Sequence, residues 1–393
     1  MTTYLLAGGG TAGHVNPLLA VADRLRERSA ADGVVVLGTA EGLEARLVPA
    51  RGYALETIPK APFPRKPDLR ALRFPARYRA AVRRARGLIR ERGIDVVIGF
   101  GGYAAAPGYA AARREGVPYV VHEANVRPGL ANARAAGRAA AVGVAFPGTP
   151  LRRGEVVGMP LRAELARLDR PVLRAEAAAH FGLDADRPVL LVFGGSTGAR
   201  RINHALAAAW PGVLAAGWQV LHATGGDKAG EVDPEGAPGR AVVPYVDRMD
   251  LAYALADLVV CRSGAATVAE LSALGIPAVY VPYAVGNGEQ ARNAEPVVRA
   301  GGALRIDDAD LTADRLLDRI APLLRDAEAR ARMGGAAGAL GARDGSDRLI
   351  ALADRALASA SRTGGGAGPG TAGRPDGTGG RWRRGRSAAG SKA

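Results

Sequence analysis

The stretch that decides the fold occupies residues 5–25, LLAGGGTAGHVNPLLAVADRL, and a second stretch at 190–210, LLVFGGSTGARRINHALAAAW, repeats its plan. Each begins with an apolar run, continues through a glycine-rich turn and ends in a segment rich in alanine and leucine. This order is typical of a buried strand that leads through a tight turn into a helix. Because the unit occurs twice, the sequence predicts two α/β domains of the same kind.

Short apolar runs alternate with helical patterns along most of the chain. They lie at residues 3–9, 33–39, 94–103, 116–125 and 139–148, and again at 187–195, 217–225, 240–246, 257–264 and 276–283. Continuous Val, Ile and Leu runs between helices indicate parallel sheets that are covered on both faces. We expect the run at 139–148 to close the first sheet and the two units to join near residues 155–170.

The predicted fold class is therefore α/β, with two Rossmann-like domains whose parallel sheets face each other across a cleft. Residues 1–160 form the first predicted domain and residues 161–358 the second, whose last helix is free to pack back on the first. Residues 359–393 are rich in glycine, carry seven basic residues against one acidic residue, and show no periodicity. This composition predicts a disordered basic tail.

Composition narrows the class of protein further. The 393 residues are 48% hydrophobic but only 5% aromatic, which suits close packing of helices on sheets. A single cysteine, Cys261, excludes a disulfide framework and indicates a reducing compartment. No apolar stretch reaches the roughly 18 residues that would span a bilayer. The net charge of +15 favours phosphates, nucleic acid or an anionic membrane surface as partners.

Three glycine-rich turns, at residues 8–14, 100–108 and 194–199, indicate close approach of the backbone to a ligand. A helix that follows such a turn directs its free amides and its positive dipole end toward the same place. None of the three is the G-x-G-x-x-G of dinucleotide enzymes or a Walker loop. The turns therefore predict an enzyme whose cleft binds phosphorylated, nucleotide-linked substrates, rather than a nicotinamide enzyme or a P-loop NTPase.

The most specific stretch lies at 259–294, VVCRSGAATVAELSALGIPAVYVPYAVGNGEQARNA. A helix that starts at Ser263-Gly264 presents the amides of Ala265 and Ala266 to an anion. Glu270, about one turn further on, can accept hydrogen bonds from the two vicinal hydroxyls of a ribose. After the next strand, a loop rich in amide side chains suits sugar hydroxyls; its members are Glu289, Gln290 and Asn293.

Together these motifs resemble the MurG family of bacterial cell-wall glycosyltransferases, which have the two-domain GT-B fold. The resemblance covers residues 4–350 and rests on GGGTAGH, GFGGYAAAPG, HEAN, VVGMPLR, GGSTGAR and CRSGAATVAE…GNGEQARNA, in family order. It implies transfer of N-acetylglucosamine (GlcNAc) from UDP-GlcNAc, with inversion at C1, to the N-acetylmuramyl (MurNAc) group of undecaprenyl-pyrophosphoryl-MurNAc-pentapeptide. This step converts lipid I to lipid II in peptidoglycan synthesis. No cofactor and no metal are implied.

The resemblance also implies which residues bind UDP-GlcNAc. Ser196 falls near the phosphates, Val246 meets the uracil through its backbone, Glu270 binds the ribose and Gln290 the sugar. The full implied set is Thr11, Ala12, Gly13, Asn125, Arg162, Ser196, Val246, Ala265, Ala266, Thr267, Val268, Ala269, Glu270 and Gln290.

The candidate catalytic base is His14 or Glu123. The usual histidine pKa of about 6.5 suits proton removal near neutral pH, and the first glycine turn directs His14 into the cleft. A neutral His14 that only orients the donor or a loop is the alternative role. Two acidic D-x-D triplets, within DAD at 184–186 and DDAD at 307–310, offer a metal-dependent alternative, although an acid before a helix is more often a cap.

A basic helix predicted within residues 64–93 suits attachment to an anionic membrane surface. Its apolar positions, Tyr78, Val82, Ala85 and Ile89, step along one face that we expect to pack inward. The residues expected to meet lipid are Leu72, Phe74, Arg77, Arg83 and Arg84. With the implied acceptor, this predicts a peripheral protein on the cytoplasmic face of the cell membrane. No nucleic-acid partner is expected, because no aromatic reader motif accompanies the arginines.

Other functions share parts of this pattern. Another GT-B glycosyltransferase, acting on a glycolipid or a secondary metabolite, would share residues 259–294 but need not keep HEAN or the basic helix. A UDP-GlcNAc 2-epimerase of the same architecture would make no membrane contact. A binding protein with a decayed site is disfavoured because Asn125, Glu270 and Gln290 are all present.

Overall fold

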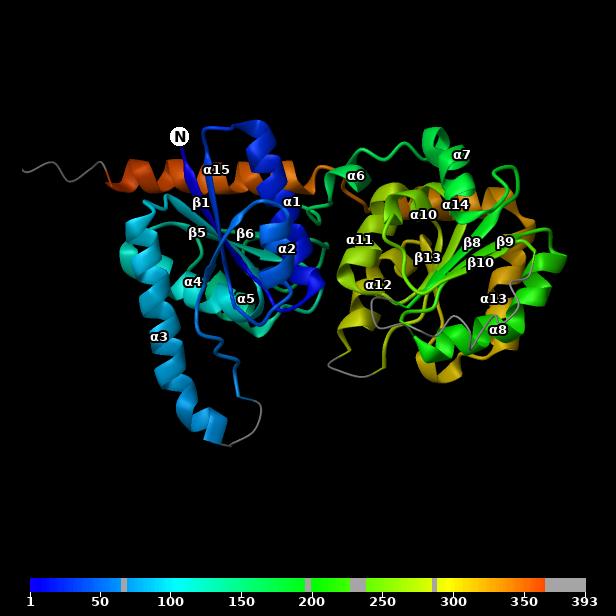
Figure 1. Cartoon of the computed structure of the whole chain (residues 1–393), viewed down its shortest axis with the longest axis horizontal. Helices are drawn as coiled ribbons and strands as arrows, with labels where there is room; N and C mark the ends of the chain where they lie inside the picture. The colour runs from blue at the N-terminus through cyan, green and yellow to red at the C-terminus, as the bar shows by residue number, and fades with distance from the viewer. Residues whose placement is uncertain (65–68, 195–198, 227–237, 285–287, 365–393) are drawn as a thin grey trace, which may run out of the picture.

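The computed structural model describes residues 1–64, 69–194, 199–226, 238–284 and 288–364, which form two α/β domains side by side (Figure 1). In the first domain seven parallel strands run in the order β3-β2-β1-β4-β5-β6-β7. They are β1 Thr3–Gly8, β2 Gly33–Gly38, β3 Ala54–Thr57, β4 Val96–Gly101, β5 Tyr119–Glu123, β6 Ala141–Val144 and β7 Gly154–Val156. The helices between them are α1 Ala12–Arg28, α2 Glu44–Ala50, α3 Leu69–Glu91, α4 Gly102–Glu115 and α5 Leu130–Ala136.

The second domain repeats this plan with six parallel strands in the order β10-β9-β8-β11-β12-β13. They are β8 Val189–Phe193, β9 Gln219–Ala223, β10 Arg240–Val243, β11 Leu258–Cys261, β12 Ala278–Tyr280 and β13 Ala303–Arg305. The helices are α6 Ala163–Ala166, α7 Arg170–Phe181, α8 Arg200–Ala215, α10 Met249–Leu255, α11 Ala265–Leu274, α12 Glu289–Arg299, α13 Ala313–Arg325, α14 Ala327–Gly338 and α15 Gly345–Gly364.

Every strand predicted from a continuous apolar run is present, and most residues of these strands are buried because helices cover both faces of each sheet. The expectation that 139–148 closes the first sheet is wrong, because β7 pairs with β6 as a further edge strand. The edge strands β3 and β13 also went unpredicted. The three are short, and β7 is exposed along its whole length, so none carries the long apolar run that marks a buried strand.

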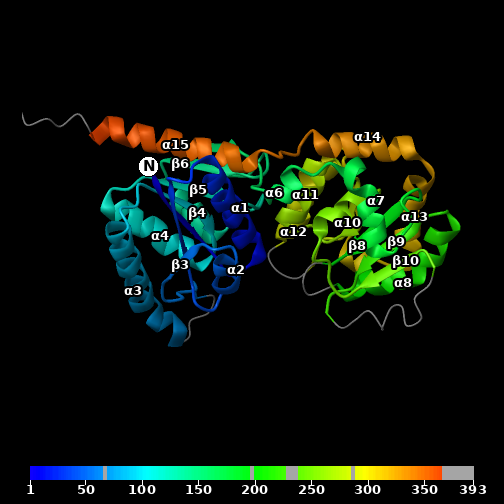
Figure 2. The ribbon, with the colours of Figure 1, turned by 45° about the horizontal axis from the view of Figure 1, so that its top comes forward.

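The last helix, α15, returns to the first domain, where it lies beside α1 (Figure 2). Leu349, Ile350 and Ala353 are buried in the same apolar cluster as Leu6 and Leu18 of the first domain. The helix extends to Gly364 and so continues past the predicted end of the second domain at residue 358. The rest of the predicted tail, residues 365–393, lies outside the described residues.

Within the described ranges, none of the helices combines the length and the apolar character that a bilayer crossing requires. Two segments connect the domains, one leading from β7 into α6 and α7, the other from α14 into α15.

Candidate active site

The predicted motifs lie where each doubly wound sheet changes direction. In the first sheet β1 is flanked by β2 and β4, and in the second β8 is flanked by β9 and β11. The loops that leave two such central strands diverge to opposite faces, and ligands of open α/β sheets bind in the crevice between them. The turn at 8–14 follows β1, the turn at 100–108 follows β4, and α11 follows β11. The two switch points therefore carry the predicted site.

The two glycine corners of the first domain touch each other. Gly102 has a φ of +78°, and a Cβ at this position would lie 2.2 Å from the carbonyl oxygen of Gly9. No L-residue side chain fits at this contact without moving the first turn. Glycine at position 102 therefore does two things: it allows the positive φ, and it lets the two site loops pack against each other.

Gly102→Ala is expected to destabilise the protein by about 3 kcal/mol or more, because strain at positive φ adds to overlap with the Gly9 backbone. Thermal unfolding measures this effect. Gly116→Ala is the matched control, since Gly116 also has positive φ (+72°) but would meet nothing within 4 Å. Equal losses for the two variants would mean that the contact with Gly9 contributes nothing.

His14 lies in the first turn of α1, beside both glycine corners. Its Nδ1 lies 3.1 Å from the hydroxyl oxygen of Thr11, and its backbone N–H donates to the Thr11 carbonyl. A Cβ on Gly101 would come within 3.1 Å of the His14 Nε2, so the ring packs against the second corner. Burial lowers the pKa of His14, and the carboxylates of Glu123 and Glu289 oppose this shift. Glu289 belongs to the second domain, so His14 lies on the side of the first domain that faces the second.

Glu123 ends β5 and is buried, at 2% exposure. Its Oε1 accepts hydrogen bonds from the backbone N–H of Asn125 at 2.9 Å and from its Nδ2 at 3.3 Å. Its Oε2 accepts from the Gly129 N–H and from the Nδ2 of Asn132, both at 2.9 Å. Four donors occupy this carboxylate, which holds the loop after β5 in shape. The geometry favours a positioning role for Glu123 and leaves His14 as the better placed base.

The second wall is formed by α11, whose N-cap residue is Gly264. Within the described chain neither α1 nor α11 has a side-chain cap for its first amides. Ala265, Ala266 and Thr267 are half-exposed there, whereas Val268 and Ala269 are buried. The exposed first turn presents backbone amides and the positive end of the helix dipole, the arrangement that binds phosphate oxygens.

Glu270 is held in place by a residue that the sequence did not single out. The hydroxyl of Tyr253, on α10, donates a hydrogen bond of 2.8 Å to the Glu270 Oε2. Burial raises the pKa of Glu270, while Tyr253 and the guanidinium of Arg162 act against the rise. Arg162, at the start of α6, has a buried Nε with no hydrogen-bond partner among the described residues. Among the described residues the other carboxylate oxygen of Glu270, Oε1, accepts no hydrogen bond.

The remaining predicted contacts lie on both domains. Gln290 accepts a hydrogen bond from the Tyr283 N–H through its Oε1, and its carbonyl accepts from the Ser263 hydroxyl, both at 2.9 Å. Val246 is buried, at 5% exposure, in the loop after β10. Thr11 and Ala12 are exposed, and Gly13 is half-exposed, at the start of α1. Ser196 lies outside the described residues.

Asn125 and Asn293 join the two domains. The Asn293 Oδ1 accepts a hydrogen bond from the Val126 N–H at 3.0 Å, and its Nδ2 donates to the Asn125 Oδ1 at 3.2 Å. Asn293 is only 1% exposed, so the expectation that it offers its side chain to sugar hydroxyls is wrong. The first domain's loop after β5 and the second domain's α12 are thus in direct contact beside the site.

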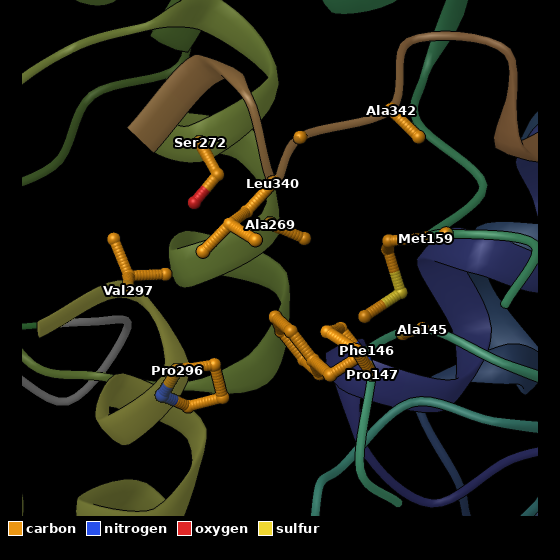
Figure 3. Close-up of a pocket in the computed structure, with 12 residues that line it drawn as sticks. Ala145, Phe146, Pro147, Met159, Ala269, Ser272, Pro296, Val297, Leu340 and Ala342 are labelled. Carbon is orange, nitrogen blue, oxygen red and sulfur yellow. The ribbon is translucent and has the colours of Figure 1, made fainter. Parts of the chain in front are cut away.

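An apolar pocket lies behind this contact, between the domains (Figure 3). Phe146 and Met159 approach it from the first-domain side, and Ala269 and Val297 from the second. The Ser272 hydroxyl is buried beside it with no partner in the described part of the chain. The domain interface is therefore incompletely packed here, in contrast to the hydrogen-bonded contact at Asn293.

The acidic triplets serve structural contacts. Asp308 pairs with Arg262 at 2.5 Å, Asp307 pairs with Arg305, and the cap of α13 is Thr312 rather than an aspartate. In the other triplet, the Asp184 carboxylate accepts the N–H of Asp186 in a turn. No cluster of three or more His, Cys, Asp or Glu suited to a metal occurs among the described residues.

Residues 4–144 match the glycosyltransferase family 28 N-terminal domain, and residues 189–349 match the corresponding C-terminal domain. A curated relative from Clavibacter michiganensis subsp. michiganensis is 60% identical over 91% of this chain and 97% of its own. Another, from Streptomyces avermitilis, is 50% identical over 90% and 98%. Both are named UDP-N-acetylglucosamine--N-acetylmuramyl-(pentapeptide) pyrophosphoryl-undecaprenol N-acetylglucosamine transferase.

Solved structures agree with the sequence matches. The crystal structure of Acinetobacter baumannii MurG has a TM-score of 0.75 and 27% identity, covering 90% of this chain and all of that one. A UDP-GlcNAc 2-epimerase from Neisseria meningitidis shares the fold at a TM-score of 0.63 but only 13% identity, over 89% of this chain and 99% of its own. With both family domains present in order, and relatives this similar over nine-tenths of its length, the chain belongs to glycosyltransferase family 28.

Proposed function

We propose that this protein transfers GlcNAc from UDP-GlcNAc to the MurNAc hydroxyl of undecaprenyl-pyrophosphoryl-MurNAc-pentapeptide. The observation that carries the proposal is 60% identity, over 91% of the chain, to a relative named for this transfer. The site supports it, because the uncapped start of α11 and the half-buried carboxylate of Glu270 lie on the second domain, and His14 of the first domain is close enough to Glu289 of the second to be influenced by its charge.

In this proposal α11 holds the donor. The amides of Ala265 and Ala266 meet the diphosphate, and Glu270, fixed by Tyr253, accepts hydrogen bonds from the ribose hydroxyls. Gln290 and Asn125 lie at the sugar end. As the bond from C1 to the diphosphate oxygen breaks, UDP leaves with the electron pair, and the helix start stabilises its growing charge.

His14 is the proposed base. The acceptor hydroxyl attacks C1 from the face opposite the departing UDP, so the configuration at C1 inverts. His14 removes the hydroxyl proton as the new C–O bond forms. Its lowered pKa keeps the imidazole neutral, and thus able to accept a proton, at neutral pH.

The experiment that tests the proposal incubates the purified protein with UDP-GlcNAc and a short-chain lipid I analogue. UDP release together with a β-linked disaccharide product is expected. Release of UDP without the lipid acceptor, or conversion of the donor to UDP-N-acetylmannosamine, would instead support the 2-epimerase alternative.

For membrane attachment we propose the N-terminal end of α3, which projects beyond the sheet of the first domain (Figure 1). Leu72 is 78% exposed there, while Val82, Ala85 and Ile89 pack into the core. Phe74 is half-buried, with its ring 5.0 Å from that of Phe63. We propose that this end rests on the cytoplasmic face of the cell membrane, where the lipid-linked acceptor resides.

The arginines of α3 contribute unequally to this surface. Arg84 pairs with Glu56 and Glu91, which offsets its charge. Arg77 and Arg83 are exposed, and neither has an ion pair among the described residues. A basic side chain near an anionic surface contributes about 1 kcal/mol. Arg77 and Arg83, with Leu72 as the apolar anchor, are therefore expected to contribute more to this surface than Arg84 does.

Leu72→Asp is expected to weaken binding to vesicles containing anionic lipid by about 10-fold or more, because it removes the apolar anchor and adds a repelled charge. Co-sedimentation with phosphatidylcholine–phosphatidylglycerol vesicles measures this. Val172→Asp is the matched control, since Val172 is 72% exposed on the second domain. If both substitutions weakened vesicle binding equally, or if neither weakened it, the membrane contact would lie elsewhere.

A further inference from the structure

Among the hydrogen bonds described, Asn293 is the one residue of α12 whose two side-chain polar atoms both bind to the first domain. It accepts from the Val126 N–H at 3.0 Å and donates to the Asn125 Oδ1 at 3.2 Å. At 1% exposure it has no surface left for a substrate. A buried amide with both ends paired is specific in its geometry, since misplacement would leave polar groups unsatisfied.

The loop that Asn293 contacts is held firmly from the other side. Glu123 accepts from the backbone and side-chain N–H groups of Asn125 and from Gly129 and Asn132. Asn132 in turn accepts from the hydroxyl of Tyr109 at 2.8 Å in the core of the first domain. A continuous chain of hydrogen bonds, buried at its first-domain end and partly buried at Asn125, therefore runs from α4 through Glu123 to α12 of the second domain.

This chain fixes how Asn125 is oriented. The Asn125 Oδ1 accepts a hydrogen bond from Asn293, and the Asn125 Nδ2 donates one to Glu123. These two bonds use one lone pair and one N–H of the Asn125 amide. A side-chain amide has two of each, so one donor and one acceptor remain. Asn293 and Glu123 together set the direction in which this remaining N–H and lone pair of Asn125 point.

Asn293 also lies close to the site along its own helix. Gln290 and Glu289 precede it by three and four residues, so the three share one face of α12. Glu289 is near enough to His14 to raise its pKa. The contact made by Asn293 thus sets the separation between the candidate base on one wall and the sugar-facing residues on the other.

We propose that Asn293 is a positioning residue that fixes the spacing of the two domains and the orientation of Asn125 in the transfer complex, without touching the sugar. The inference rests on the proposed function for its kinetic consequences only. The hydrogen bonds themselves can be tested without turnover.

The test compares Asn293→Ala, which removes both hydrogen bonds, with Asn293→Asp. The aspartate keeps an oxygen that accepts from the Val126 N–H, but it places a second oxygen against the Asn125 Oδ1, where the Asn293 N–H donated. We expect kcat/KM for the lipid acceptor to fall about 10-fold or more in both. The Kd of UDP should change less than about two-fold, because the uridine contacts lie on the second domain. Glu295→Gln is the control, since Glu295 is exposed on the same helix and pairs with Arg299.

Hydrogen exchange of the Val126 amide gives a readout independent of activity. It should accelerate in Asn293→Ala and stay protected in Asn293→Asp. Because Asn293 acts largely through Asn125, adding Asn293→Ala to Asn125→Ala should lower kcat/KM much less than Asn293→Ala does alone. Unchanged exchange at Val126, or full additivity of the two substitutions, would overturn the inference. Absence of transfer by the unaltered protein would instead refute the proposed function and leave the exchange result standing.

Discussion

His14→Ala is expected to lower kcat by about 100- to 10,000-fold, the range that removal of a general base produces. The Kd of UDP-GlcNAc should change by less than about threefold, since His14 lies on the first domain and the proposed diphosphate and ribose contacts on the second. Stopped turnover assays and calorimetric titration measure the two quantities. His204→Ala, at an exposed position on α8, is the control and should leave both unchanged.

The pH dependence of the same variant distinguishes a base from an orienting histidine. Burial lowers the pKa of His14 below its ordinary value of 6.5, so the ring is neutral at pH 7 and becomes protonated only as pH falls further. Protonation abolishes the acceptor lone pair, and kcat should therefore decline on the acid side, below pH 6.5. This acid limb should disappear in His14→Ala. A limb that persists in the variant would assign the base to another group.

Arg262→Met is expected to destabilise the second domain by about 3 kcal/mol, the lower end of the cost of breaking a buried ion pair, because Asp308 keeps only the exposed Arg201 at 3.4 Å as a partner. The Arg262 Nη1 lies 2.5 Å from the Asp308 Oδ1, and both side chains are nearly nine-tenths buried. Arg262 also donates to the carbonyl of Val281 at 3.1 Å. It thereby ties the end of β11, where α11 begins, to the end of β12.

Chemical unfolding followed by the fluorescence of Trp218, buried in the second domain, measures this loss. The control is Arg299→Met, which removes an exposed partner from the pair with Glu295 and should cost less than about 1 kcal/mol. A double variant, Arg262→Met with Asp308→Leu, should recover much of the stability because no uncompensated charge stays buried. Equal stability of Arg262→Met and the unaltered protein would show that the pair contributes nothing.

The central strands and the turns after them could be predicted from sequence, because their signals are local. In β1 and β8 the apolar run is continuous, and the glycine turn directly follows it. The edge strands β3, β7 and β13 carry no comparable signal, since only one neighbour pairs with them and their faces are partly open. The sequence left the last helix free to pack back on the first domain. Its return depends on packing against residues more than 300 positions earlier in the chain, which no local pattern encodes.

The site was predictable to the same extent. His14, Glu270 and Gln290 follow a glycine turn or lie near a helix start, so motif spacing singled them out as site residues, and as such they stay predictions. The role of Tyr253 depends on a contact between α10 and α11, and the role of Asn293 on a contact between domains. A side chain's partner across the fold is set by tertiary packing, and Asn293 accordingly faced the loop after β5 rather than a sugar.

Titration calorimetry of the unaltered protein with UDP-GlcNAc shows whether the two switch points form one site for a uridine diphosphate sugar. We expect saturable heat with one binding site per chain, and competition by UDP at the same site. No heat with UDP-GlcNAc, or binding that UDP fails to displace, would contradict it.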